Sequence, residues 1–157
     1  MLLRTFAIVF FSCTSLLGLT LVAEPSVGAP QQELKRADLI VETQRGGVRI
    51  SAEVAVTPVE QEIGLKGRER HLGVAGMYFP QTKPEIVEVS TEGNRFPVDV
   101  VFVGEDGAIA RIDPGISRPS GIIRSPGQIS AYLQVAAGAA SKLGLREGDR
   151  IRPDLEG

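Results

Sequence analysis

Alternating apolar and polar positions mark the start of the folded part of this chain. Over residues 48–56, aliphatic side chains occupy every second position, and mostly polar residues lie between them. This two-residue period predicts a strand with one buried face. Thr57, Pro58 and Glu60 follow and are typical of a helix start, because threonine can cap the first turn, proline fits it and glutamate can complete a capping box. We expect a short helix that ends at Gly64.

Apolar runs farther along the chain predict more strands. A short strand is expected at 77–79, stopped by Pro80, and another at 85–91. Residues 98–103 are apolar at every position except Asp99, which is typical of a central strand covered on both faces. The remaining expected elements are a hairpin turn at 104–107, strands at 108–112, 130–135 and 150–152, and a short helix at 136–143.

These patterns together predict the fold class. Residues 47–153 are expected to form a single mainly-β domain, a compact sandwich or distorted barrel of about six or seven strands with two short helices. Its longest irregular segment, 114–127, holds three prolines and three glycines. Such a long loop is usually functional or mobile.

The N-terminal residues 1–29 have a different character. Arg4 precedes an apolar run over 6–22, which is typical of a secretory signal peptide. The run has about 18 residues, the low edge of what a membrane-spanning helix needs, so a retained N-terminal anchor is the alternative. Either way we expect an extracytoplasmic domain, periplasmic or secreted, that touches the membrane only through this segment. Residues 30–46 carry few large apolar side chains and are expected to form a flexible arm.

Composition excludes several function classes. The chain has 17 Lys+Arg against 19 Asp+Glu, a formal charge of −2, which argues against nucleic acid as a partner, because phosphate binding needs a clustered basic surface. One cysteine and one histidine cannot make a Cys/His zinc site or a disulfide framework. The histidine, His71, lies in a polar stretch and is expected to be solvated. We therefore expect no metal site, no cofactor and no catalytic residue.

Asp99 is the most informative candidate. It is the only charge in an apolar strand, and an unpaired buried carboxylate would be costly, so it must reach a rim, meet a cation or be protonated. Arg68 and Arg95 are the available cations. An ion pair that fixes the 66–73 loop against the sheet is one interpretation. The other is a ligand-binding site formed by Arg68, Arg95 and Asp99.

Four groups of residues, in order from residue 57 to residue 149, carry a family resemblance. They are Thr57-Pro58, Glu60, Gly64-Leu65 and Arg68, like T-P-x-E-x-x-x-G-L-M-x-R; Gly76-Met77 and Phe79, like G-M-L-F; Pro97-Val98-Asp99 and Phe102, like P-L-D-I-x-F; and Ala137-Gly138, Leu143-Gly144 and Gly148-Asp149, like P-A-G-x-A-x-x-L-G-I-x-x-G-D. The series resembles the domain-of-unknown-function 192 family of small extracytoplasmic or membrane-attached bacterial and archaeal proteins. The resemblance implies a mostly-β fold, and the family has no settled reaction.

One stretch departs from the family pattern. Where the family usually carries W-M-K-N-T before P-L-D, residues 90–94 read Ser-Thr-Glu-Gly-Asn, and Lys66 replaces the usual methionine. If this stretch lines the family's functional surface, that surface is altered in this member.

Three functions remain open. The first is a non-enzymatic module that binds a small polar ligand or an envelope protein through the 114–127 loop and the region of Arg68 and Asp99. The second is a hydrolase acting on an envelope glycan, which needs Asp99 and Glu88 or Glu92 about 5 to 10 Å apart across one cleft. The third is a protein-interaction adaptor, which needs an exposed apolar patch.

Overall fold

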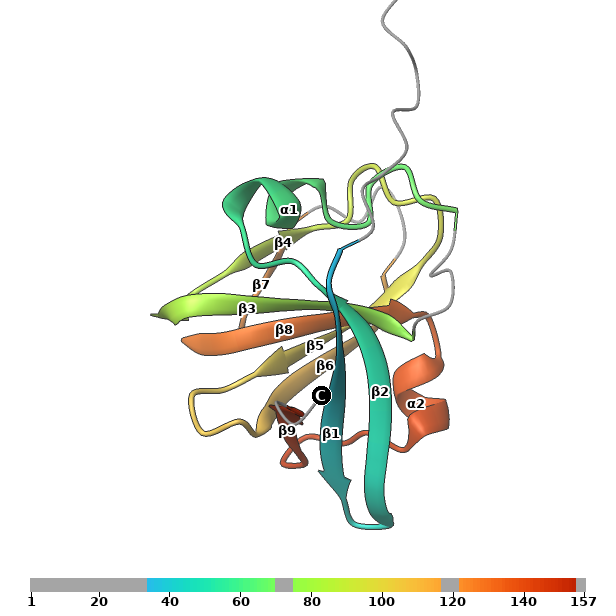
Figure 1. The fold of residues 1–157 in the computed structure, drawn as a ribbon, viewed down its shortest axis with the longest axis vertical. Coiled ribbons are helices and arrows are strands. Elements are labelled where there is room, and N and C mark those ends of the chain that lie inside the picture. The colour runs from blue at the N-terminus through green and yellow to red at the C-terminus, as the bar shows by residue number, and fades with distance from the viewer. Residues whose placement is uncertain (1–33, 70–74, 117–121, 155–157) are drawn as a thin grey trace, which may run out of the picture. The chain divides into compact units, whose positions relative to one another are not determined.

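Strands dominate the part of the chain described by this computed structural model, residues 34–69, 75–116 and 122–154 (Figure 1). All of these residues belong to one unit of the chain, residues 31–157. The predicted mainly-β class with two short helices is confirmed. In chain order the elements are β1 (Arg36–Thr43), β2 (Gly46–Val54), α1 (Pro58–Ile63), β3 (Gly76–Glu85), β4 (Glu88–Ser90), β5 (Val98–Val103), β6 (Ile109–Ile116), β7 (Ile122–Arg124), β8 (Ile129–Ala136), α2 (Ala139–Leu143) and β9 (Arg150–Pro153).

Seven strands form one mixed sheet in the order β6-β5-β8-β3-β2-β1-β9, and β4 and β7 form a separate pair. Only the β2–β3 pairing is parallel within this described sheet. The large sheet curls so that its two edges meet at an isolated bridge between Ala108 and Arg150 (Figure 1). A single bridge is not a ladder, so the sheet is not closed into a barrel.

Apolar side chains pack on both faces of the large sheet. Val101 and Val103 of β5 join one cluster with β1, β2 and α2, whereas Val98, Val100 and Phe102 join the other. All six residues of β5 are buried, as the apolar run predicted. The predicted hairpin that leads out of β5 is also present, with the Gly104 N–H donating to the Ala108 carbonyl at 2.8 Å.

The predicted flexible arm at 30–46 is wrong for its second half. Residues Arg36–Thr43 form β1, which pairs with β2 on one side and β9 on the other. Leu39 and Val41, two residues apart, are fully buried in the core. Two large side chains at strand spacing are a weak pattern, and pairing with β2 and β9 supplies the stability that the composition does not show.

The predicted 114–127 loop is also wrong over most of its described residues. β6 continues through Pro114 to Ile116, and Ile122–Arg124 form β7, while 117–121 lie outside the described residues. Pro114 is tolerated because β6 is an edge strand and its pairing with β5 has a register shift between Asp113 and Ile116. β3 likewise runs past Pro80 to Glu85.

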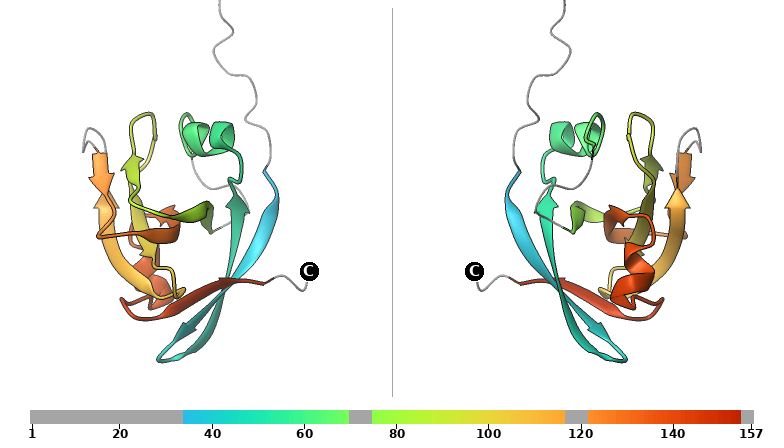
Figure 2. Two further views of the ribbon diagram at one scale, coloured as in Figure 1. Left: turned by 90° about the vertical axis from the view of Figure 1, so that its left-hand side faces the viewer. Right: turned by 90° about the vertical axis from the view of Figure 1, so that its right-hand side faces the viewer.

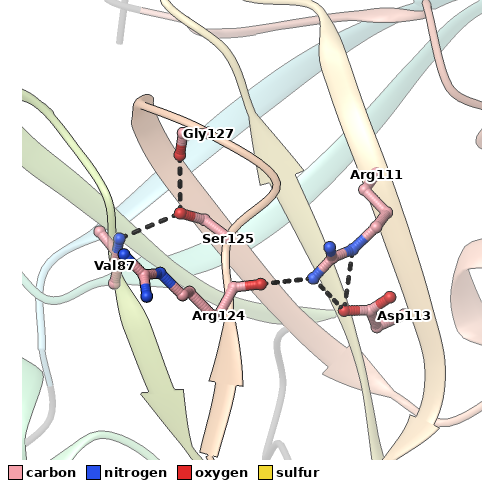
Figure 3. Close-up of polar contacts among 6 residues, drawn as sticks. All are labelled: Val87, Arg111, Asp113, Arg124, Ser125 and Gly127. Carbon is pink, nitrogen blue, oxygen red and sulfur yellow. Dashed lines mark hydrogen bonds and ion pairs between the residues drawn. The ribbon is translucent and has the colours of Figure 1, made fainter.

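Polar contacts attach the β4–β7 pair to the large sheet (Figure 3). Arg111 of β6 donates to the Arg124 carbonyl at 2.6 Å and to Asp113 Oδ2 at 2.7 Å. Ser125 Oγ accepts from the Val87 N–H at 3.0 Å and donates to the Gly127 carbonyl at 2.7 Å. These bonds fix β4 above the sheet, and β4 forms one wall of the pocket described below.

The helix α1 depends on its cap, because it has no buried residue. Thr57 Oγ1 accepts from the Glu60 N–H at 3.2 Å, and Glu60 Oε2 accepts from the N–H groups of Thr57 and Val56, both at 2.8 Å. The predicted capping box is therefore confirmed. Those two backbone donors lower the pKa of Glu60 below its usual 4.5, so its contribution to stability holds above that pH and is lost as the pH falls.

We expect Thr57→Ala to lower the free energy of unfolding by about 1 kcal/mol, because it removes a side-chain acceptor from the first turn of α1. Urea denaturation at neutral pH measures the loss. The matched control is Thr57→Ser, which keeps the hydroxyl and should stay close to the parent protein. Equal stability of the alanine and serine variants would show that the cap does not stabilise the fold.

Candidate functional site

A pocket of about 210 Å³ lies between α1 and β4, over the neighbouring strands β3 and β8. Figures 1 and 2 show α1 and β4 on the same side of the large sheet. Phe79 of β3 and Tyr132 of β8 line the pocket, and their rings stack with centroids 4.4 Å apart and planes 7° from parallel. The pocket therefore has a rigid aromatic side built from two paired central strands.

Three buried polar side chains also line the pocket. Asn94, Tyr132 and Gln134 are 5%, 7% and 3% exposed. Among the described residues, none of their side-chain polar groups has a hydrogen-bond partner, and the amide nitrogen of Asn94 is fully buried without one. Buried polar groups are nearly always paired, so the unpaired amide nitrogen of Asn94 is unusual. Burial raises the pKa of Tyr132 well above its usual 10.0, which keeps its hydroxyl protonated and able to donate.

A tight turn positions Asn94. The preceding Gly93 has a φ of 88°, and a Cβ there would lie 2.9 Å from Lys66 Cγ, so only glycine fits. The Gly93 carbonyl accepts from the Gly67 N–H at 2.9 Å. The segment after α1 and the turn before β5 are thus fixed to each other. Lys66, Glu62 and Glu88 also line the pocket and bring charges of both signs to it.

Asp99 has backbone partners instead of a cation. Its Oδ1 accepts from the N–H groups of Gly115 at 2.8 Å and Gly138 at 3.1 Å, and its Oδ2 accepts from Ala140 at 3.1 Å. Asp99 is 1% exposed and joins β5 to β6 and to the first turn of α2. The predicted ion pair with Arg68 or Arg95 is therefore wrong, because main-chain donors surround this carboxylate.

The two arginines have other partners. Arg68 pairs with Glu53 of β2, and Arg95 pairs with Glu69 at 3.2 Å. The interpretation that an ion pair fixes the loop after α1 to the sheet holds, with Glu53 in place of Asp99. The structure does not bring Arg68, Arg95 and Asp99 together, so their predicted role as one ligand site stays a prediction without geometric support. His71 lies outside the described residues.

The carboxylates do not take the arrangement expected for a two-carboxylate hydrolase. Glu88 lines the pocket next to α1, whereas Asp99 lines a different pocket next to α2. Within 34–69, 75–116 and 122–154 there is no cluster of three or more side chains suited to a metal ion. The same residues contain no helix that is long and apolar enough to cross a membrane.

The sequence profile of DUF192, described as an uncharacterised family, matches residues 40–153. The chain belongs to the DUF192 family. A solved structure from Novosphingobium aromaticivorans DSM 12444, of a protein of unknown function, is 26% identical, with 83% of this chain and 94% of that one covered and a TM-score of 0.73. A protein from Sinorhizobium meliloti 1021, whose name proposes a transcription regulator, is 25% identical, with 79% and 98% covered and a TM-score of 0.72. No curated protein matches.

The stretch that departs from the DUF192 pattern lies at the pocket. Ser90 and Asn94, its first and last residues, both line the cavity. Within this stretch only Glu92 was a candidate from the sequence, as a hydrolase carboxylate, and the pocket residues Tyr132 and Gln134 were not predicted. The divergence at 90–94 was the signal that could have located the site.

Proposed function

We propose that this DUF192 member is an exported, non-enzymatic module of the cell envelope that binds a small polar ligand in the pocket between α1 and β4. The observation that carries the proposal is the amide nitrogen of Asn94, which is fully buried without a hydrogen-bond partner in a pocket that Tyr132 and Gln134 also line. A buried donor without a partner costs about 1–3 kcal/mol. A ligand that hydrogen-bonds to this nitrogen recovers that free energy.

The size and lining of the pocket support a small ligand. About 210 Å³ is room for a single sugar ring or an amino acid, and small-ligand sites combine apolar walls with a few convergent polar groups. Here Phe79 supplies an apolar wall, and amide and hydroxyl groups supply the polar contacts. Lys66 and Glu88 allow the ligand to carry charges of either sign.

A thermal-shift screen of the full chain against monosaccharides and amino acids tests the proposal, because a ligand of the folded state raises its melting temperature. For any compound that binds, we expect Tyr132→Phe to weaken binding about fivefold to tenfold by removing one hydrogen bond. Ser90→Trp should abolish binding, because the indole would fill the cavity.

The matched control is Tyr78→Phe. Tyr78 is buried to a similar extent on the neighbouring strand β3, but it belongs to the cluster on the other face of the sheet and does not line the pocket. A compound that binds the Tyr132→Phe and Ser90→Trp variants as tightly as the parent protein would place the ligand elsewhere and contradict the proposal.

A protein-interaction adaptor is the second candidate. Val56, Val59 and Ile63 on and beside α1, with Ile86 and Ile122 near the β4–β7 pair, are the large apolar side chains that stand exposed in the described part of the chain. An adaptor would use this outer surface, so partner binding should survive Tyr132→Phe, which changes only a buried hydroxyl.

A further inference from the structure

A second pocket, of about 330 Å³, lies beside α2 and contains two arginines. Arg45 comes from the β1–β2 turn and Arg146 from the segment between α2 and β9, and both line the cavity. The two positions are about a hundred residues apart in sequence, so their presence at one cavity is a product of the fold. The pocket has no lining residue in common with the pocket next to α1.

Neither guanidinium group has a partner among the described residues. Arg45 and Arg146 make hydrogen bonds only through their main chains: their N–H groups donate to Thr43 Oγ1 at 3.1 Å and to Asp149 Oδ2 at 2.8 Å, and the Arg146 carbonyl accepts from the Asp149 N–H at 3.1 Å. Five other described arginines form ion pairs, whereas Arg124 and Arg150 do not: Arg49 pairs with Asp38 and Asp154, Arg68 with Glu53, Arg95 with Glu69, Arg111 with Asp113 and Arg152 with Glu42. The cavity thus contains two positive charges that the protein leaves uncompensated by an ion pair.

Asp99 is the one carboxylate that lines this pocket, and it does not balance the two arginines. Both of its oxygens already accept backbone N–H groups, at 2.8 to 3.1 Å, from β6 and from the start of α2. The formal charge of the lining residues is +1, from two arginines and one aspartate. The positive side of the pocket is therefore the side formed by the arginines.

We propose that this pocket binds a small organic anion that carries a carboxylate or phosphate group. A guanidinium presents a planar fork of donors that matches such groups bidentately. The Ser141 hydroxyl adds a donor within the same lining. Ile112, Pro114 and Leu145 form an apolar wall, which suits the carbon skeleton of an organic anion better than a bare inorganic ion.

The test is isothermal titration of the full chain with succinate and with glycerol 3-phosphate, with inorganic phosphate as the reference ion. At least one organic anion should bind more tightly than inorganic phosphate. Arg45→Ala and Arg146→Ala should each weaken that binding at least tenfold, and the double variant should abolish it. Because neither side chain has a bond within the described protein, the variants should melt at the parent temperature without ligand.

Lys142→Ala is the matched control, because this substitution also removes one positive charge, and Lys142 lies on α2 but does not line the cavity. It should keep the affinity of the parent protein. Equal losses for Lys142→Ala and the arginine variants would show general charge attraction and overturn the proposal. Binding that is unchanged in both arginine variants, or no binding of any of the three ions at millimolar concentration, would also overturn it. Ser90→Trp should leave this binding intact, so the two pockets are tested separately.

Discussion

Replacing Asp99 by alanine is expected to lower the free energy of unfolding by about 3–5 kcal/mol, a large effect for a single substitution. The carboxylate is 1% exposed and accepts three backbone hydrogen bonds. Its removal leaves the N–H groups of Gly115, Gly138 and Ala140 without their acceptor. α2 has no side-chain cap of its own, so Asp99 takes over that role from β5.

Urea denaturation of the parent protein, Asp99→Ala and Asp99→Asn measures the effect. Asparagine keeps one acceptor oxygen but turns an amide N–H₂ toward backbone donors, so an intermediate loss is expected. Asp113→Ala is a control on the adjacent strand β6, where the partly exposed pair with Arg111 should contribute about 1 kcal/mol or less. A loss below about 1 kcal/mol for Asp99→Ala would mean that water replaces the carboxylate at these donors.

Asp99 also shows how far sequence reasoning reaches. The apolar run around it predicted correctly that the strand is central and that a bare charge there needs a partner. The partner could not be predicted, because the donors are main-chain groups 16, 39 and 41 residues away that carry no side-chain signature. Lysine and arginine can be identified in a sequence as possible partners of a carboxylate. Backbone N–H groups are present at nearly every residue, so the sequence does not indicate which of them will donate.

Local patterns predicted local structure well. The capping box at Thr57 and the Gly104–Gly107 hairpin depend on neighbouring residues, and both are confirmed. The strand β1 lies between β2 and β9, and it was missed because its own residues are a weak strand pattern and its partner β9 lies more than a hundred residues later. Both pockets likewise depend on residues that are far apart in the sequence. Tyr132 and Asn94 come together only because α1 and β4 pack over β8, so neither could be identified from its own neighbours.

Arg68→Ala is expected to lower the free energy of unfolding by about 3–5 kcal/mol, because it leaves the buried carboxylate of Glu53 without its ion-pair partner. The side chains of Arg68 and Glu53 are 13% and 5% exposed, and they pair with each other. Glu53 has no other side-chain partner among the described residues. Without the guanidinium, Glu53 must stay charged in an apolar setting, take up a proton or leave the core.

The pair need not be favourable as a whole. Both groups lose their hydration, and Arg68 Nε is buried without a partner, which adds to the cost. We therefore expect the double variant Arg68→Met with Glu53→Leu to recover most of the stability lost in either single variant. A double-mutant cycle by urea denaturation gives the coupling energy. Losses that simply add would show that the two side chains act independently.

The same variants distinguish an effect of the ion pair on stability from an effect on the geometry of the pocket next to α1. The segment that carries Arg68 also holds the turn before Asn94, through the bond from the Gly67 N–H to the Gly93 carbonyl. If the ion pair matters only for folding, the Met/Leu variant should bind a pocket ligand as tightly as the parent protein. If the pair also sets the direction of this segment, the variant should be stable yet bind more weakly, because apolar packing fixes a position less strictly than a charged hydrogen bond does.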